Sequence, residues 1–149
     1  MKILFYIGNL RKGGAERVVA TLSNKLVEKN EVIIITTTDE KVEYSLDKSI
    51  KLFSLKNFDG NKNPLVKNII YLKRLKDYIK EIDPDIILGF LPEPSYRLLI
   101  LKPFIKSPVI ISDRNDPKIE YASLKSRTIM KFLYKRADGF VFQTDEARD

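Results

Sequence analysis

The sequence predicts an α/β protein with a doubly wound, mainly parallel sheet. Short apolar runs rich in Ile, Val and Phe recur along the 149 residues and are near-continuous rather than alternating, which is typical of strands buried on both faces. Segments with helical periodicity lie between most of these runs. A glycine pair, Gly13 and Gly14, follows the first run, and folds of this class bind ligands at the carboxyl ends of their strands.

The strands are expected where the apolar runs lie. These cover residues 2–7, 31–37, 50–55, 85–90, 108–112 and 139–142. The step from residue 38 to residue 50 has no helical pattern, so it is either a hairpin or a loose crossover. The helices are expected over residues 15–29, 64–82, about 94–105 and about 120–136.

Two of the helices have a clear apolar face. In the first it consists of Ala15, Val18, Val19, Leu22 and Leu26. In the second, which has Pro64 in its first turn, it consists of Leu65, Ile69, Leu72, Leu75 and Ile79. Residues 143–149 are typical of a strand end followed by a new helix with Thr144 as its N-cap, so we expect the sequence to be the first part of a longer protein.

The composition excludes several kinds of chemistry. Cysteine is absent, so there is no disulfide framework or thiolate metal site, which agrees with a reducing cytoplasm. Histidine is also absent, which removes the commonest general base and the commonest zinc ligand. No apolar stretch approaches the roughly 18–20 residues of a membrane span, and no signal-peptide pattern follows residue 7. We therefore expect a cytoplasmic protein.

The charge indicates an anionic ligand or surface. Lys and Arg number 27 against 20 Asp and Glu, a formal net charge of +7, which attracts nucleotides, nucleic acid or anionic lipid. Many of the positive residues lie in two expected helices, within 62–81 and 118–136, where they form either solvated faces or a membrane-facing surface. They are not interleaved with aromatic residues in a nucleic-acid-binding pattern, so we expect no nucleic acid partner.

The first strand-to-helix turn, from Gly8 to Arg17, predicts an anion cradle. Gly13 and Gly14 allow positive φ angles and close approach of a ligand to the backbone. The N–H groups of the helix that begins here point to the same place. The turn lacks the pattern of a Walker loop and of a dinucleotide-binding loop. The alternative is a tight turn that only lets the helix pack.

Four segments carry a resemblance to a known family. They are Gly-Gly-Ala-Glu-Arg-Val at 13–18, Pro-Asp-Ile-Ile-Leu-Gly-Phe at 84–90, Ile-Ser-Asp-Arg-Asn-Asp-Pro at 111–117 and Ala-Asp-Gly-Phe-Val-Phe-Gln-Thr at 137–144. In this order they resemble glycosyltransferase family 4, and the likeness spans essentially the whole sequence.

The resemblance implies one Rossmann-like half of a GT-B enzyme. Such enzymes transfer a sugar from a nucleotide-diphosphate donor to an acceptor with retention, without a cofactor and without a required metal. Residues 1–149 would be the N-terminal, acceptor-side domain, with the C-terminal nucleotide-sugar domain absent and the fragment inactive alone. The loop that lies against the donor diphosphate or sugar would be Gly13, Gly14, Ala15 and Glu16. The catalytic residues are not assigned.

Two further loops are expected at the acceptor or in the cleft. One contains Asp113, Arg114 and Asn115, where Arg114 would bind a phosphate and Asp113 a sugar hydroxyl; the alternative is a self-capped turn before Pro117. Many family members have a histidine in this region, and this sequence has none. The other loop contains Glu93 and Ser95, for which capping of the next helix is the alternative role.

The resemblance thus predicts a transferase in surface polysaccharide assembly. The expected partners are a nucleotide sugar, a glycan or polyprenyl-linked acceptor, the protein's own C-terminal domain and an anionic membrane surface at the inner leaflet. The alternative function is a stand-alone Rossmann-like module that binds a nucleotide or anion without catalysis.

Overall fold

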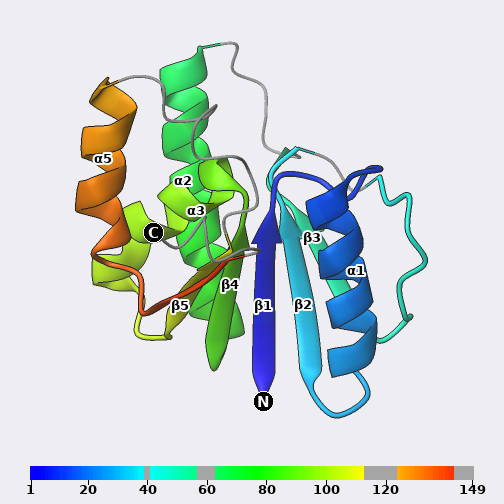
Figure 1. The fold of residues 1–149 in the computed structure, drawn as a ribbon. Helices are drawn as coiled ribbons and strands as arrows, with labels where there is room; N and C mark the ends of the chain where they lie inside the picture. The colour runs from blue at the N-terminus through cyan, green and yellow to red at the C-terminus, as the bar shows by residue number, and fades with distance from the viewer. Residues whose placement is uncertain (39–40, 57–62, 113–123, 143–149) are drawn as a thin grey trace.

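The computed structural model describes residues 1–38, 41–56, 63–112 and 124–142. Figure 1 shows one parallel sheet between two layers of helices. The elements in chain order are β1 (Lys2–Ile7), α1 (Gly14–Leu26), β2 (Glu31–Thr36), β3 (Lys51–Ser54), α2 (Pro64–Ile82), β4 (Ile86–Phe90), α3 (Pro92–Leu101), η2 (Lys102–Phe104), β5 (Val109–Ser112), α5 (Leu124–Tyr134) and β6 (Gly139–Val141). None of the described helices is long and apolar enough to cross a membrane.

The strand order β3-β2-β1-β4-β5-β6 confirms the doubly wound fold. All the described strand pairs are parallel, with Phe5 of β1 opposite Ile34 of β2 on one side and Leu88 of β4 on the other. Because β2 and β3 are parallel, the connection between them is a crossover and not a hairpin. The expected strand 139–142 ends at Val141 in the structure, and the other strands agree with the expectation to within two residues.

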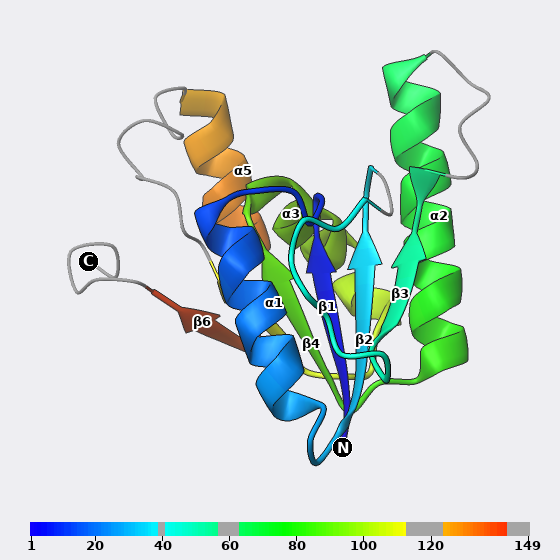
Figure 2. The same ribbon diagram turned by 90° about the vertical axis from the view of Figure 1, so that its right-hand side faces the viewer.

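Both faces of the sheet are buried, which explains why the strand sequences are near-continuously apolar. Leu4 and Tyr6 of β1 belong to the core under α2, α3 and α5, and the alternate residues Ile3, Phe5 and Ile7 belong to the core that includes α1. Figures 1 and 2 show α1 on one face of the sheet and the other three helices on the opposite face.

The apolar face predicted for α1 is wrong at Leu22, which is 40% exposed. The buried residues of the helix are Ala15, Val19, Ala20 and Ser23. The crossover after β2 runs alongside this helix, because Asn24 donates to the carbonyl of Ser45 and accepts from the N–H of Asp47, both at 2.8 Å. The small residues Ala20 and Ser23 are buried, and Leu22 is turned toward solvent.

The apolar face predicted for α2 is wrong at its first two turns. Asn63 caps the helix by accepting from the N–H of Leu65 at 3.0 Å, and Pro64 follows as expected. However, Leu65 is 74% exposed and Ile69 is 66% exposed, while Leu75 and Ile79 are buried. Figure 2 gives the reason, since the first turns of α2 extend beyond the carboxyl ends of the strands and have no sheet to pack against.

The helix expected from about residue 94 begins earlier, at Pro92, and ends in the short 3-10 helix η2. Both prolines lie in the first turn of α3, where a missing N–H costs no hydrogen bond. The helix packs closely on β4 because Gly89 has no side chain. A Cβ at that position would lie 2.7 Å from Leu98 and 3.1 Å from Ile111. The final expected helix is α5, of which residues 124–134 are described.

Candidate functional site at the carboxyl edge of the sheet

The crevice of this fold is expected between β1 and β4. The chain moves from β1 to β2 and β3 on one side of the sheet and returns to β4 on the other, and doubly wound proteins bind ligands at such a switch point. The residues there are the loop after β1, Thr37 and Thr38 after β2, and the start of α3 after β4. Thr38 donates from its backbone N–H and its hydroxyl to the carbonyl of Gly8, at 3.0 and 3.1 Å, which fixes the loop after β1 to the end of β2.

The glycine loop does not use positive φ angles, so this part of the prediction is wrong. Gly13 is extended, with φ −177° and ψ 166°, and Gly14 is the first residue of α1; none of the described glycines has a positive φ. The two glycines therefore do not serve to form a strained turn.

The two glycines differ in their surroundings. A Cβ on Gly13 would clash with the carboxylate of Glu16, which folds back over the N-cap residue. A carboxylate in the first turn is favoured by the helix dipole, and the absence of a side chain at residue 13 makes room for it. A Cβ on Gly14, by contrast, would meet nothing within 4 Å. Nothing among the described residues requires glycine at position 14.

The crossover segment after β2 holds the glycine loop in place. Lys12 donates its N–H to the carboxylate of Glu43 at 2.7 Å. The hydroxyl of Tyr44 accepts from the N–H of Gly13 at 2.9 Å and donates to its carbonyl at 2.7 Å. The backbone bond to Lys12 lowers the pKa of the Glu43 carboxyl, and Lys41 adds to this effect. The loop is thus fixed before any ligand arrives.

The N–H groups that remain for a ligand belong to the first turn of α1. The first intrahelical bond of the helix runs from the N–H of Arg17 to the carbonyl of Gly13, at 3.1 Å. Among the described contacts, the N–H groups of Gly14, Ala15 and Glu16 have no acceptor, and Gly13 provides no side-chain cap. This arrangement fits the predicted anion cradle. The groups that could bind an anion are those of the helix N-terminus alone, not those of the whole loop.

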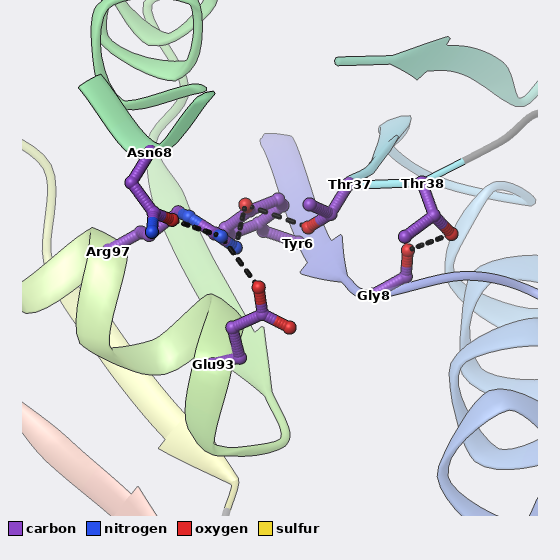
Figure 3. Close-up of polar contacts among 7 residues, drawn as sticks. All are labelled: Tyr6, Gly8, Thr37, Thr38, Asn68, Glu93 and Arg97. Carbon is purple, nitrogen blue, oxygen red and sulfur yellow. Dashed lines mark hydrogen bonds and ion pairs between the residues drawn. The ribbon is translucent and has the colours of Figure 1, made fainter. Parts of the chain in front are cut away.

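A second polar cluster lies beside β1, on the face covered by α2 and α3 (Figure 3). Arg97 of α3 is at its centre, with a side chain only 7% exposed. Its Nη2 donates to Glu93 Oε1 at 2.6 Å and to Asn68 Oδ1 at 2.8 Å, and its Nη1 lies 3.4 Å from the hydroxyl of Tyr6. That hydroxyl accepts from the hydroxyl of Thr37 at 2.9 Å. The cluster joins four elements at the carboxyl edge.

The ionisation states in the cluster follow from burial. Burial raises the pKa of the Tyr6 hydroxyl, although Arg97 and the bond from Thr37 oppose this, so the phenol stays neutral at physiological pH. Burial disfavours the charged form of Arg97, but Tyr6 and Glu93 outweigh it and raise the pKa of the guanidinium. The charge of Arg97 is therefore paired with that of Glu93.

The backbone just before Glu93 is strained. Leu91, the N-cap residue of α3, has φ 70° and ψ 157°, a conformation adopted almost only by glycine. Such a residue costs about 1–3 kcal/mol and persists where its surroundings fix it. Here the N–H of Leu91 bonds the carbonyl of Ser112 at 3.3 Å, and its carbonyl accepts from the N–H of Ser95 at 3.1 Å.

The predicted residues Glu93 and Ser95 have different environments. Ser95 is buried, and its hydroxyl donates to the carbonyl of Leu91 at 2.6 Å, so it supports the helix start. Glu93 is 67% exposed and does not cap the helix. Asp113, Arg114 and Asn115 lie outside the described residues, as do residues 143–149.

The predicted site lacked several residues that the structure brings together. Arg97 has one sequence signal, its place four residues after Glu93 in an otherwise apolar helix. Tyr6 and Thr37 lie in apolar strand sequences, and Glu43 and Tyr44 lie in a crossover without periodicity. Their proximity arises from strand order, which no local pattern reveals.

Solved structures share the fold. The sucrose-phosphate synthase of Thermosynechococcus elongatus matches with a TM-score of 0.77 and 12% identity, covering 99% of this chain and 44% of that one. MurG of Acinetobacter baumannii matches with a TM-score of 0.69 and 16% identity, covering 97% of this chain and 42% of that one. Each match thus places this fold in less than half of a longer protein, as expected for one half of a GT-B structure.

Two curated relatives come from Campylobacter jejuni. One is the GalNAc-α-(1→4)-GalNAc-α-(1→3)-diNAcBac-PP-undecaprenol α-1,4-N-acetyl-D-galactosaminyltransferase, which is 32% identical over 118 residues, or 78% of this chain and 33% of the relative. The other is the N-acetylgalactosamine-N,N′-diacetylbacillosaminyl-diphospho-undecaprenol 4-α-N-acetylgalactosaminyltransferase, which is 30% identical and covers 92% of this chain and 40% of the relative. This chain therefore spans about two fifths or less of their length.

The family model of Glycosyltransferase Family 4 matches residues 12–149. The match begins at the glycine loop and includes Asn68, Glu93 and Arg97 of the second cluster, whereas Tyr6 precedes it. Together with the fold, it shows that the chain belongs to Glycosyltransferase Family 4.

Proposed function

We propose that this chain is the N-terminal, acceptor-side domain of a retaining glycosyltransferase. The enzyme transfers a hexose-type sugar from a nucleotide-diphosphate sugar to a glycan on a polyprenyl diphosphate, in surface polysaccharide assembly. The observation that carries the proposal is the family match over residues 12–149, together with two relatives whose names describe N-acetylgalactosaminyl transfer to undecaprenyl-diphosphate-linked saccharides. The second domain supplies the nucleotide site, and the reaction needs neither metal nor cofactor.

The start of α1 supports a role in binding the donor. Gly14 leaves open space beside three N–H groups without acceptors, at the positive end of the helix. A diphosphate or the transferred sugar fits this position, and it would be stabilised most as negative charge develops on the leaving diphosphate. Glu16 folds back over Gly13 at the same helix end, where its carboxylate would accept a hydrogen bond from a sugar hydroxyl.

A transfer assay tests the proposal. Residues 1–149 are compared with the same residues joined to a family-type nucleotide-binding domain, using a panel of nucleotide sugars and polyprenyl-diphosphate-linked glycans. We expect multiple turnovers only with both domains, and a product anomer identical to that of the donor by NMR. Multiple turnovers by residues 1–149 alone would contradict the two-domain role, and an inverted product would contradict retention. Tight nucleotide binding by residues 1–149 alone, without transfer by either protein, would favour the stand-alone binding module.

We further propose that the domain attaches reversibly to the cytoplasmic face of an anionic membrane, where a polyprenyl-linked acceptor resides. Aromatic side chains lie beside cations on the helical layer of α2, α3 and α5. Phe104 is 66% exposed with the amine of Lys76 4.3 Å from its ring centre, and Phe132 is 64% exposed with the guanidinium of Arg136 at 5.0 Å. Such pairs combine apolar insertion with attraction to anionic headgroups, about 1 kcal/mol per charge near the surface.

Vesicle co-sedimentation at low and high salt tests the attachment. Vesicles rich in phosphatidylglycerol are expected to bind the chain and lose it at high salt, and neutral vesicles are expected not to bind it. The variants Phe104→Ser and Lys76→Glu should weaken binding. Leu22→Ser and Lys29→Glu, on the opposite face, serve as matched controls because both residues are exposed on or beside α1. Equal binding to both vesicle types would refute the electrostatic attachment.

A further inference from the structure

The two side chains of the Glu93–Arg97 ion pair differ strongly in their exposure to solvent. The side chain of Arg97 is 7% exposed, whereas that of Glu93 is 67% exposed. Only one carboxylate oxygen, Oε1, contacts the guanidinium, at 2.6 Å. Figure 3 shows the second oxygen directed away from Arg97, on the side of α3 that faces Gly8 and Thr38. Arg97 is thus fixed inside the protein, and Glu93 presents, at the carboxyl edge of the sheet, an oxygen that has no partner among the described residues.

The position of Arg97 is fixed from several directions. Asn68 of α2 and Tyr6 of β1 accept from its two Nη groups, and its guanidinium lies over the ring of Tyr71 at 5.3 Å. Its Nε is buried and has no hydrogen-bond partner among the described residues. A buried cation with an unsatisfied donor is a poor contributor to stability, because apolar residues of similar volume are often equal or better in such places. The arrangement is better explained by what it does to Glu93.

We propose that Glu93 binds a hydroxyl group of the acceptor sugar through its free oxygen, and that Arg97 is the residue that positions this carboxylate. The inference rests on the proposed function and adds the recognition chemistry of its acceptor site. An ionised carboxylate accepts hydrogen bonds only, so the ligand group must be a donor such as a sugar hydroxyl, and a phosphate is excluded by its charge. The location agrees, because ligands bind outside the carboxyl ends of β1 and β4.

Preorganisation is the physical gain from this arrangement. A free glutamate side chain loses rotamer freedom when it binds a ligand, whereas Glu93 is already held by a charge-assisted bond to a fixed guanidinium. The strained backbone at Leu91 also sets the direction in which the first turn of α3 leaves β4. Binding of a neutral polar sugar, which has little apolar surface to contribute, depends strongly on such fixed acceptors.

The test measures sugar binding by residues 1–149, with methyl α-N-acetylgalactosaminide as the probe and ¹⁵N chemical shifts as the readout. Shifts are expected at the first turn of α3. Glu93→Gln should weaken binding about tenfold, since the charged acceptor is lost. Arg97→Met should weaken it several-fold, roughly three- to tenfold, and Arg97→Lys should restore part of the loss because the charge remains while the fork geometry does not.

The design separates positioning from structure. Arg97→Met leaves Glu93 and Asn68 exposed to water and the Tyr6 hydroxyl paired with Thr37, so the urea unfolding midpoint should change little. Glu28→Gln is the control for loss of an exposed carboxylate in an ion pair, because Glu28, just after α1, pairs with Lys25 at 3.0 Å. Should Arg97→Met fail to fold, Glu93→Gln and Arg97→Lys still decide the question.

Two results would overturn the inference. One is a probe affinity in Glu93→Gln equal to that of the unsubstituted chain, and the other is no binding of the probe by the unsubstituted chain. In the transfer assay, Glu93→Gln should raise the KM for the acceptor and leave the KM for the donor unchanged. A two-domain enzyme that transfers sugar with an unaltered acceptor KM after this substitution would refute the role of Glu93 and leave the proposed transferase function intact.

Discussion

Gly13 and Gly14 are glycines for different physical reasons. A side chain at position 13 would meet only the flexible end of Glu16 and would displace its carboxylate, so glycine leaves room there for Glu16 without being strictly required. At position 14 the space is open and the residue is the first of the helix, where glycine costs less than the roughly 1 kcal/mol relative to alanine of a helix interior. Since no described atom near position 14 requires a glycine, a ligand that approaches the backbone would explain one there.

Replacing Gly14 therefore separates folding from activity. Gly14→Ala is expected to keep or slightly raise the free energy of unfolding, and Gly14→Val to leave the fold intact because no atom lies within 4 Å of the added Cβ. Transfer by the two-domain enzyme should fall in both, and at least tenfold for valine, since a branched side chain blocks the N–H groups. Urea unfolding and initial rates check this. Activity within a few-fold of the unsubstituted enzyme would refute the cradle.

Tyr6 supports the buried side of the Arg97 cluster. Its hydroxyl is the partner of both Thr37 and Arg97, and all three side chains are buried. Tyr6→Phe removes the shared oxygen and leaves two buried donors without that acceptor, so we expect a loss of roughly 1–3 kcal/mol in the free energy of unfolding. Thr37→Val removes only the hydroxyl of Thr37 and should lower the free energy of unfolding by less, because the Tyr6 oxygen still accepts from Arg97. Urea denaturation at neutral pH measures both, and equal stability of Tyr6→Phe and the parent would contradict the account.

Candidate residues can be read from the sequence only where the chemistry is local. Glu93 is such a candidate because it is the charged residue of a stiff loop after a strand, and this needs no tertiary information. Ser95 was assigned to the cleft, yet its burial depends on how closely α3 packs on Gly89. The partnership of Tyr6 with Arg97 joins residues 91 positions apart, which periodicity and motif cannot reveal.

At the scale of single elements, two aspartates in the family-like segments have structural roles. Asp85 precedes β4, and its Oδ2 accepts from the N–H of Lys2 at the start of β1, at 2.6 Å. Asp138 precedes β6, and its Oδ2 accepts from the N–H of Val109 at the start of β5, at 2.8 Å. Each carboxylate thus fixes the beginning of the neighbouring strand. Both lie at the amino edge of the sheet, opposite the site.

The role of Asp138 predicts a pH dependence. The bond to the Lys102 amine at 2.6 Å, followed by the Val109 N–H, lowers the pKa of the Asp138 carboxyl below its ordinary value of 3.8. An acid with a depressed pKa stabilises the fold above its unfolded-state pKa, and this stability is lost as the pH falls through the folded-state pKa. Asp138→Asn should therefore be less stable than the parent at pH 7 and nearly equal to it at strongly acidic pH.

Urea unfolding at a series of pH values checks this expectation. Asp77→Asn is a suitable control, because Asp77 is an exposed residue of α2. A stability difference between Asp138→Asn and the parent that is independent of pH would show that the aspartate acts through packing alone.

Element positions were predictable to within a few residues, but two helix faces were not. The run from Leu65 to Ile79 has the periodicity of a buried stripe, and its first part is exposed because the helix is longer than the sheet beneath it. Sequence periodicity records which residues share a helix face and contains no information on where the neighbouring layer ends. The boundary of α3 was missed for a related reason, since it depends on a positive φ at Leu91, a residue type that rarely adopts one.

At the scale of the whole molecule, the parallel order β3-β2-β1-β4-β5-β6 places both candidate clusters at one edge. The fold class could be predicted because both faces of a parallel sheet must be apolar, and this leaves a clear pattern in the sequence. The sequence did not distinguish a crossover from β2 to β3 from a hairpin, because either connection joins two apolar runs through a segment without helical periodicity. Because the connection is a crossover, Glu43 and Tyr44 lie against the glycine loop.

The outermost strand β6 affects how copies of the chain behave at high concentration. It is the outermost of the described strands, with Phe140 38%, Val141 50% and Phe142 37% exposed and the two aromatic rings stacked at 5.7 Å. An apolar edge with unpaired backbone groups is a template for joining two sheets. We expect the chain to self-associate reversibly in sedimentation velocity runs, and Val141→Lys to keep it monomeric without loss of fold. Unchanged association in that variant would place the contact elsewhere. In a preparation of residues 1–149, a single charge on β6 is thus expected to decide whether two sheets can join at this margin.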